Sequence, residues 1–330
     1  MKKFSVVTIC LVAILSLSCA LCGCLRTPSG DKLPDSISCY VPDGAPALAV
    51  ANIASCKKIA GVSVSTVVTT GEDVVAKCAS GEADMAVLPT NAAVTICNKR
   101  NDYLLYSVNV HGLLYVVGTK NITELSQLEG TVLSIGLGNT PEFVFKTVLD
   151  NKGVTYGDNG DIDFQYYADG STIIPLLMQS ATKGETKFAV LGEPAVSNLL
   201  NKAAEQGKDM FRLFDLQQLW QEATDSDTTG YPQASLIVKK TLLNNKEFAD
   251  SLHQLVFSNG EYLQQNLSSL NALMKSVGSS LDVDYTAEII NNCNIHAVLA
   301  KDVKDDLNTY LQKFSAVAEL LPLSQDIFYE

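Results

Sequence analysis

From residue 37 onward, short apolar runs rich in β-branched residues alternate with longer stretches in which apolar residues recur at helical spacing. This alternation predicts an α/β fold with mostly parallel sheets flanked by helices. The predicted strands are 37–41, 62–68, 84–88, 103–109, 113–118, 131–135, 162–167, 188–191, 211–214 and 233–238. The predicted helices are 47–59, 74–80, 90–98, 142–150, 172–179 and 193–204, followed by a nearly all-helical region over 245–314.

Residues that favour helix N-termini stand directly after several predicted strands. Pro46 occupies the place of a first helical residue, which suits its fixed φ and missing N–H. Thr69 and Glu72 have the spacing of a capping box, and Thr90 is placed to cap the helix that follows it. Helices that begin in this way leave unpaired backbone N–H groups at the carboxyl edge of the sheet.

The order of the elements predicts two lobes. Residues 37–112 and 230–330 would form a discontinuous lobe 1, and residues 113–229 would form lobe 2, inserted between them. The chain would cross between the lobes near 110–113 and 229–233, and these crossings would act as a hinge. Folds of this kind place a ligand between the lobes, at the carboxyl ends of the strands.

The N-terminus has the pattern of an export signal. Two lysines precede an almost wholly apolar run at 4–17, which has the length of a signal-peptide core and is short for a membrane span. The sequence LCGC at 21–24 then matches the bacterial lipobox. We therefore expect a lipoprotein signal peptide at 1–23, a lipid on Cys24 and a flexible tether at 24–36. The alternatives are a signal peptide cut nearby without lipidation and an uncleaved anchor.

Charge and cysteine usage narrow the possible partners. The formal net charge is −12 and the chain has three arginines, which argues against binding to nucleic acid or, through basic patches, to anionic lipid. Five cysteines follow residue 24, most of them inside apolar runs and none in a CxxC pair. We expect mostly buried, reduced thiols, at least one of them free because the number is odd. These cysteines are Cys39, Cys56, Cys78, Cys97 and Cys293.

Motifs of catalysis and cofactor binding are absent. The sequence GLGNTP at 136–141 begins like a dinucleotide fingerprint but has proline at its sixth position. The chain contains no GxxxxGK[ST], GxSxG or HExxH motif, and its three histidines lack metal-ligand spacing. We expect no catalytic residues, no cofactor and no metal site.

Five segments resemble, in their order and spacing, the type II solute-binding proteins of ABC importers. The resemblance is to the branch that contains nitrate, alkanesulfonate, taurine and thiamine-pyrimidine-precursor binders, and it extends over nearly all of the chain after the signal peptide. Gly192 departs from the pattern, because many relatives carry proline there. The segments are PDGAPALAVANI (42–53), GEADMAVLPTNAA (81–93), GLGNTPEFVFKTVL (136–149), KFAVLGEPAVS (187–197) and LPLSQDIFYE (321–330).

The resemblance implies a hinged, two-lobe periplasmic-binding-protein fold that captures a small molecule and has no chemistry of its own. Its implied partners are the ligand and an ABC permease with separate ATPase subunits, and we expect a monomer. It would be held by lipid at the outer face of the cytoplasmic membrane. Ligand identity stays open among thiamine-pyrimidine-like compounds, sulfonates or taurine, and nitrate. Two other functions stay open: a ligand sensor that feeds a signalling receptor, and an enzyme of pyrimidine synthesis on the same fold.

Loops at predicted helix N-termini are the first candidates for ligand contact, because such ends offer hydrogen-bond donors and partial positive charge. Residues at three such loops could touch the ligand or simply cap their helices. They are Asp43, Gly44 and Ala45, then Thr90 and Asn91, then Gly138, Asn139 and Thr140.

Other candidates lie near the predicted crossings. His111 could contact ligand or be a hydrogen-bonded structural histidine. Glu193 could accept a hydrogen bond from an amino or amidine group, or stabilise its own helix. Tyr231, Tyr40 and Trp220 could stack on a ligand or pack in the core.

Overall fold

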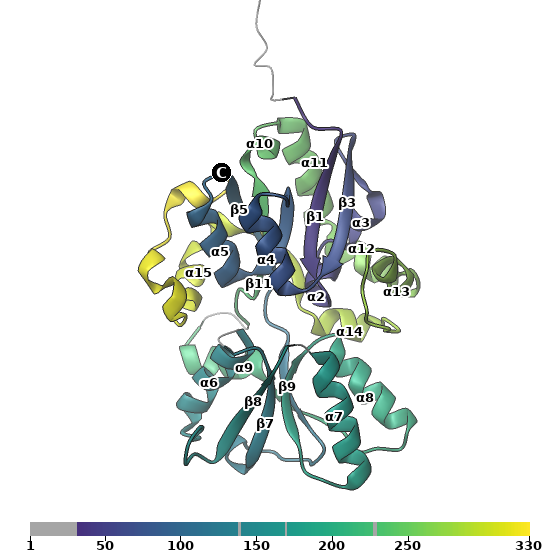
Figure 1. The fold of residues 1–330 in the computed structure, drawn as a ribbon, viewed down its shortest axis with the longest axis vertical. Coiled ribbons are helices and arrows are strands. Elements are labelled where there is room, and N and C mark those ends of the chain that lie inside the picture. Colours follow the sequence, from purple (N-terminus) through teal and green to yellow (C-terminus); the bar gives the residue numbers. More distant parts are fainter. Residues whose placement is uncertain (1–31, 138–139, 169, 227–229) are drawn as a thin grey trace, which may run out of the picture.

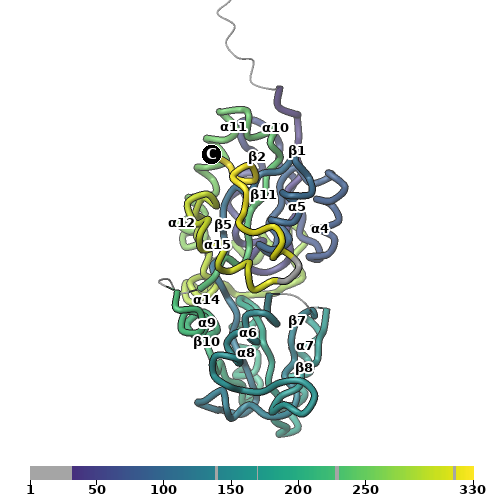
Figure 2. The backbone as a smooth tube through the Cα atoms, turned by 90° about the vertical axis from the view of Figure 1, so that its left-hand side faces the viewer, coloured from purple at the N-terminus to yellow at the C-terminus, as the bar shows by residue number. Residues whose placement is uncertain are grey.

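The computed structural model describes residues 32–137, 140–168, 170–226 and 230–330. The predicted signal peptide, Cys24, most of the predicted tether, Gly138 and Asn139 lie outside the described residues. Figure 1 shows two α/β lobes, one above the other, and Figure 2 shows the same arrangement from the side.

The first lobe is built on a seven-stranded sheet with strand order β12-β5-β11-β4-β1-β3-β2. Its strands are β1 (Ser36–Pro42), β2 (Lys58–Ile59), β3 (Val62–Thr69), β4 (Met85–Pro89), β5 (Tyr103–Val110), β11 (Ala234–Lys239) and β12 (Ile295–Leu299). Helices α4 (Gly71–Ser80) and α5 (Thr90–Lys99) cover one face, and α3 (Ala51–Cys56), α11 (Lys246–Phe257) and α12 (Asn259–Gln265) cover the other (Figure 2). The remaining helices of this lobe are α2 (Ala45–Leu48), α10 (Lys240–Leu243), α13 (Leu267–Ser276), α14 (Ala287–Asn292) and α15 (Lys304–Leu311).

The second lobe is built on a five-stranded sheet with strand order β10-β6-β9-β7-β8. Its strands are β6 (Leu114–Gly118), β7 (Gly130–Ile135), β8 (Ile162–Tyr167), β9 (Phe188–Gly192) and β10 (Phe211–Asp215). Helices α6 (Thr140–Lys152) and α9 (Leu216–Thr224) lie on one face, and α7 (Gly170–Lys183) and α8 (Ala195–Glu205) lie on the other (Figure 1). The lobe boundaries at residues 112 and 230 remain a prediction.

The α/β fold class is confirmed, but the sheets are mixed rather than mostly parallel. Strand β1 runs parallel to β3 and β4, and β7 runs parallel to β8 and β9. In contrast, β11 is antiparallel to both of its neighbours, and so is β6. Both antiparallel strands follow a crossing between the lobes, so they enter their sheets without the βα connection that makes neighbouring strands parallel.

Several predicted elements are wrong in detail. The region predicted as helix at 47–59 is split into α2, α3 and β2, and the region predicted as nearly all helix contains β12. Helix α9 was not among the predicted helices. Thr70, not Thr69, caps α4, because its side chain accepts from the Asp73 N–H. Thr90 lies inside α5 and does not cap it, because its hydroxyl is bonded to the Ser235 hydroxyl.

The larger of two apolar cores extends from the first lobe into the second. It includes Val116 and Val132 of the second sheet and Phe145 of α6. The smaller core lies between the second sheet and helices α7 and α8. Within the described ranges, no helix is long and apolar enough to cross a membrane.

Candidate functional site

The carboxyl ends of the central strands of the first sheet lie along one edge. Pro42 pairs with Thr69 at the ends of β1 and β3, and β4 runs parallel to β1. At the same edge, Ala234 at the start of β11 pairs with Pro89 and with Val110. Because the chain leaves for the second lobe directly after Val110, this edge faces the second lobe.

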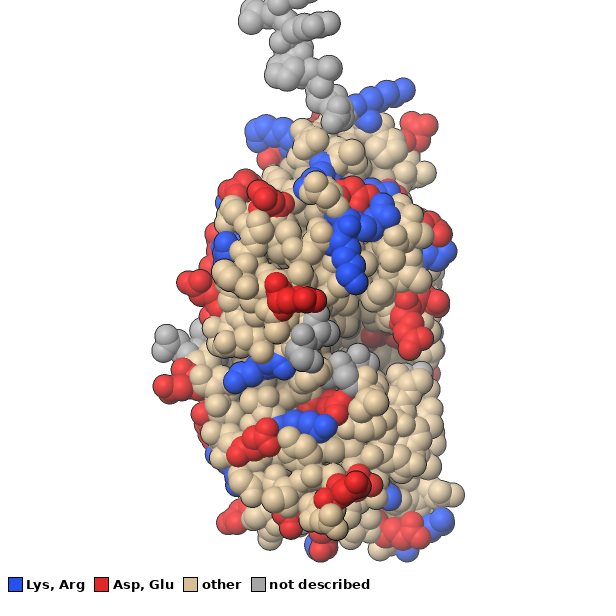
Figure 3. Space-filling view, turned by 60° about the vertical axis from the view of Figure 1, so that its left-hand side comes forward, with Lys and Arg blue, Asp and Glu red and all other residues tan. Residues whose placement is uncertain are grey.

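The second sheet turns a matching edge toward the first lobe. Leu114, the first residue of β6, pairs with Gly192 at the end of β9, and Ile135 pairs with Tyr167 at the ends of β7 and β8. The two edges approach closely, because a Cβ atom on Gly44 would lie 3.8 Å from Cδ of Pro194. Figure 3 shows the surface hollowed between the two lobes. The loop after β1 and the loop after β9 therefore meet at this interlobe region.

Two of the predicted polar residues of the first lobe are engaged within that lobe. Asp43 accepts hydrogen bonds from the Ser279 hydroxyl at 2.6 Å and from the Ser280 N–H at 2.8 Å, which ties the loop after β1 to the segment after α13. The Thr90 hydroxyl lies 2.8 Å from the Ser235 hydroxyl and is fully buried. These contacts give both side chains a structural role, and their contact with ligand remains a prediction.

Unlike the side chains of Asp43 and Thr90, two amide side chains at the interlobe edge of the first lobe have an oxygen without a hydrogen-bond partner among the described residues. These atoms are Oδ1 of Asn91 and Oε1 of Gln233, and both are buried. The N–H of Thr90, the residue before Asn91, donates to the Gln233 carbonyl at 3.1 Å. Gln233 therefore lies beside the start of α5. No side chain caps α5, so its first turn also presents backbone donors here. Gln233 was not among the predicted site residues, because its flanking residues carry no motif.

His111 is built into the crossing between the lobes. Its ring stacks on that of His296 with 3.8 Å between ring centroids, and its Nε2 lies 3.1 Å from the His296 carbonyl. Burial, reinforced by His296, lowers the pKa of His111 to about 4, so the ring is neutral at physiological pH. The Asn294 carbonyl also accepts from the His111 N–H at 3.1 Å. These contacts give His111 a structural role as a neutral residue in the crossing between the lobes.

Glu193 is paired inside the second lobe. Its carboxylate accepts hydrogen bonds from the Ser197 N–H at 3.0 Å and the Ser197 hydroxyl at 2.9 Å, and it forms a salt bridge with Arg212. The guanidinium of Arg212 also lies over the ring of Tyr115, 4.6 Å from its centroid. Burial raises the pKa of Glu193, although Ser197 and Arg212 oppose that effect. This role of Arg212 was not predicted from the sequence.

The predicted aromatic residues take different places. Tyr231 donates to Oε1 of Gln217 at 3.1 Å and is buried with Trp220 in an interlobe cluster. Thr140 joins the same cluster, because its hydroxyl lies 3.3 Å from that of Tyr310. Tyr40 donates to Oε1 of Glu82 at 3.2 Å, within the first lobe.

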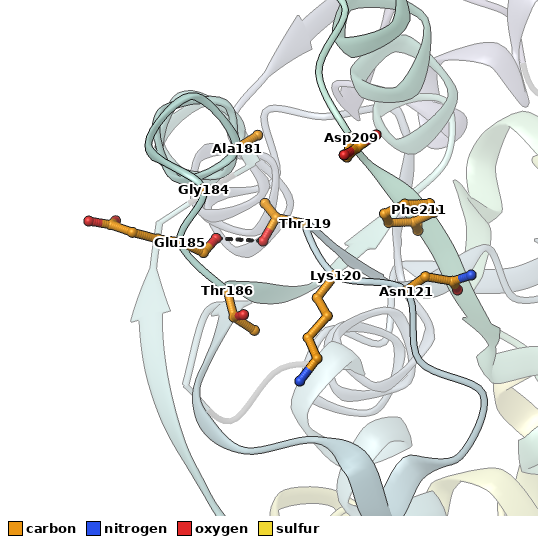
Figure 4. A pocket seen from close by; sticks show the side chains of 9 residues that line it. All are labelled: Thr119, Lys120, Asn121, Ala181, Gly184, Glu185, Thr186, Asp209 and Phe211. Carbon is orange, nitrogen blue, oxygen red and sulfur yellow. Dashed lines mark hydrogen bonds between the residues drawn. The ribbon is translucent and has the colours of Figure 1, made fainter.

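A separate hollow of about 400 Å³ lies at the far edge of the second lobe. It begins where β6 ends, since Gly118 pairs there with Phe211, and Thr119 donates across it to the Glu185 carbonyl at 2.7 Å (Figure 4). The interlobe region lies at the opposite end of these strands. In the described part of the chain, no group of three His, Cys, Asp or Glu residues could hold a metal ion.

Comparison with known proteins shows the fold. No family model and no curated protein matches the chain. An ABC transporter structure from Parabacteroides distasonis is similar with a TM-score of 0.72 and 22% identity, over 90% of this chain and 99% of that one. The ligand-binding component of an ABC-type import system from Staphylococcus aureus is similar with a TM-score of 0.63 and 14% identity, over 90% of this chain and 97% of that one. The periplasmic aliphatic sulphonate binding protein of Escherichia coli is similar with a TM-score of 0.61 and 13% identity, over 90% of this chain and 93% of that one. The chain therefore has the periplasmic-binding-protein fold.

Proposed function

We propose that this chain is the extracytoplasmic solute-binding protein of an ABC importer. The observation that carries the proposal is the convergence of two sheet edges on one interlobe region, with the first-lobe edge presenting an uncapped helix and the Asn91 and Gln233 amides. The matched structures from Staphylococcus aureus and Escherichia coli are binding components by name, and their likeness over about 90% of the chain supports the same role here.

Capture would work by closure of the lobes. A solute that touches both edges binds the closed form better than the open form and shifts the population toward it. The closed form would then deliver the solute to a membrane permease driven by separate ATPase subunits. The protein supplies binding and performs no reaction.

The polar groups at the interlobe edge favour a solute with N–H donors. The unpaired atoms of Asn91 and Gln233 are acceptor oxygens, and Arg212 is already paired with Glu193. A thiamine-pyrimidine-like heteroaromatic or a taurine-like zwitterion would supply N–H groups to these oxygens. A nitrate or simple sulfonate would have to rely on the donors in the first turn of α5.

The lipobox cysteine, Cys24, would hold the protein at the outer face of the cytoplasmic membrane. Among the described residues, the first strand, β1, begins at Ser36. The stretch between Cys24 and Ser36 would then serve as the tether to the membrane.

Thermal unfolding of the chain from residue 25 against a panel of solutes tests the proposal. The panel holds thiamine pyrimidines, riboflavin, purines, taurine, alkanesulfonates, nitrate and bicarbonate. A bound solute at ~100 times its dissociation constant adds about 2.7 kcal/mol to the free energy of unfolding. We expect Asn91→Ala and Gln233→Ala to reduce the shift, and Asn121→Ala, an exposed amide in the distal hollow, to leave it intact. A panel without any shift, or a shift that both cleft variants retain, would contradict the proposal.

A further inference from the structure

Two adjacent backbone crossings join the lobes. The first is 111–113 and the second includes 230–233. Gly230 has φ +96°, and a Cβ there would lie 2.1 Å from the His111 carbonyl oxygen, so the crossings touch through their backbones. They are tied to α9 as well, because Leu114 N–H donates to Oε1 of Gln217 at 2.7 Å. Two crossings held this closely define one region about which the lobes can turn.

A third connection between the lobes comes from the C-terminal part of the chain. Tyr310 of α15 stacks on Tyr231 of the second crossing, with 5.7 Å between ring centroids and an interplanar angle of 12°. Its ring meets the edge of Trp220 of α9 at 5.8 Å, and its hydroxyl lies 3.3 Å from that of Thr140 in α6. Tyr310 is 2% exposed, so these contacts are dry.

Phe314 extends the same contact. Its ring lies 4.5 Å from that of Phe143 in α6 and 5.0 Å from that of Tyr310. We call Phe143, Trp220, Tyr231, Tyr310 and Phe314 the interlobe aromatic cluster. It belongs to the larger apolar core, which is why that core continues from one lobe into the other.

The C-terminal segment that carries Tyr310 and Phe314 is fixed to the first lobe. Tyr329 N–H donates to the Leu105 carbonyl of β5 at 3.2 Å, which holds the end of the segment on the first sheet. Within the segment, Leu323 N–H donates to Oδ1 of Asn308 in α15 at 2.9 Å, which links this end to the helix that carries Tyr310. The cluster therefore joins two bodies, the first lobe and the α6–α9 face of the second lobe.

On the other side of the crossings the contacts are of a different kind. Figure 1 places α6, α9 and α15 on one side of the crossings and α8 and α14 on the other. On that second side, Gly44 approaches Pro194 without a side chain of its own. The exposed carboxylate of Asp282 has its pKa lowered mainly by Lys275 and also by Lys202 of α8, so charges face each other there through solvent.

We infer that the interlobe aromatic cluster is a fixed pivot, so that the lobes open only on the side of Gly44 and Pro194. Separating the lobes at the cluster would expose several buried rings to water, whereas the approach of Gly44 to Pro194 involves no aromatic ring. As a device that directs closure on a solute, the pivot rests on the proposed function. As a mechanical property of the hinge, it does not need a bound solute.

Distances between spin labels in the solute-free protein test this inference. The background is Cys56→Ser, because Cys56 is exposed and the other four cysteines after residue 24 are buried. One labelled pair, Asn151→Cys with Lys313→Cys, reports on the cluster side, and the other, Asn201→Cys with Asp284→Cys, reports on the cleft side; all four positions are exposed. We expect the distance distribution of the cluster-side pair to be roughly half as wide as that of the cleft-side pair, or narrower.

Substitutions in the cluster sharpen the test. Phe314→Ala should broaden the cluster-side distribution, whereas Phe248→Ala, which removes an equally buried ring inside the first lobe, should not. Phe314→Leu is the milder variant if Phe314→Ala does not fold. Equal widths for the two pairs in the wild-type protein, or a cluster-side distribution unchanged by loss of Phe314, would overturn the pivot. No solute is used, so this result is independent of whether the panel finds one.

Discussion

Replacing Arg212 by methionine leaves the buried carboxylate of Glu193 without the cation that it pairs with. Glu193 is 3% exposed, and Arg212 is the cation paired with it. Methionine keeps an apolar side chain over the ring of Tyr115 but cannot neutralise Glu193. Two hydrogen bonds from Ser197 remain. Removal of one partner from a buried ion pair lowers the free energy of unfolding by roughly 3–5 kcal/mol when the remaining group stays charged and buried.

Glu193 can become neutral by taking up a proton, and this limits how much Arg212→Met lowers the free energy of unfolding. Burial already raises its pKa, and loss of the opposing Arg212 raises it further. Protonation costs about 1.36 kcal/mol for each pH unit above the ordinary glutamate pKa of about 4.3, which is about 1 kcal/mol at pH 5 and about 3.7 kcal/mol at pH 7. A carboxyl group with a raised pKa in the folded state stabilises the fold at low pH and loses that contribution as pH rises. The decrease in the free energy of unfolding caused by Arg212→Met should therefore grow by up to about 2.7 kcal/mol between pH 5 and pH 7.

Urea unfolding of wild type and Arg212→Met at pH 5, 6 and 7 measures this growth. Two controls separate charge from packing. Glu193→Gln combined with Arg212→Met has no carboxyl group to titrate, so its difference from wild type should vary much less with pH than that of Arg212→Met. Arg100→Met breaks a half-buried pair with Asp102, whose pKa is lowered mainly by its hydrogen bond with Arg100, so the effect of Arg100→Met on the free energy of unfolding should not change over this pH range. A loss in Arg212→Met that is constant from pH 5 to pH 7 would refute the reasoning.

Two further predictions concern the hinge and the thiols. Gly230→Ala places a Cβ 2.1 Å from the His111 carbonyl oxygen, so it should cost more than the ~1–2 kcal/mol of a left-handed alanine, whereas Gly61→Ala, with φ +82° and open space around it, should cost no more than that. Equal urea midpoints for the two variants would contradict the close contact of the crossings. In the chain from residue 25, Cys56 alone should react quickly with Ellman's reagent, and Cys56→Ser should abolish the fast phase, because burial raises the pKa of Cys39 to about 12 and likewise raises those of the other three thiols. Fast reaction of a second thiol would contradict that burial.

Much of the fold follows from local patterns. The apolar and β-branched runs that become β1 and β3 are bounded by turn residues, and Pro46 lies in the first turn of α2, one residue after the helix begins at Ala45. Helix α9 could also have been found, because Asp215 stands directly before it and its carboxylate accepts from the N–H groups of Gln217 and Gln218. Strand β12 could not, because five residues between helices become a strand only by pairing with β5.

The position of several candidate residues was predictable, but their contacts were not, and their binding of a ligand stays a prediction. The rule that ligand loops follow the carboxyl ends of strands brought Asp43, Asn91 and Glu193 to the interlobe region. Which side chains remain unpaired there depends on contacts between distant segments. The Thr90 hydroxyl is satisfied by Ser235, 145 residues away, and periodicity carries no information about such a pair.

Hydrogen–deuterium exchange with the panel compound that gives the largest thermal shift tests the central claim most directly. If the solute is held between the lobes, amides at 43–45 and 90–92 of the first lobe and at 192–195 of the second should be protected together. Protection confined to one lobe, or confined to 119–121 and 184–186 around the distal hollow, would contradict capture between the lobes.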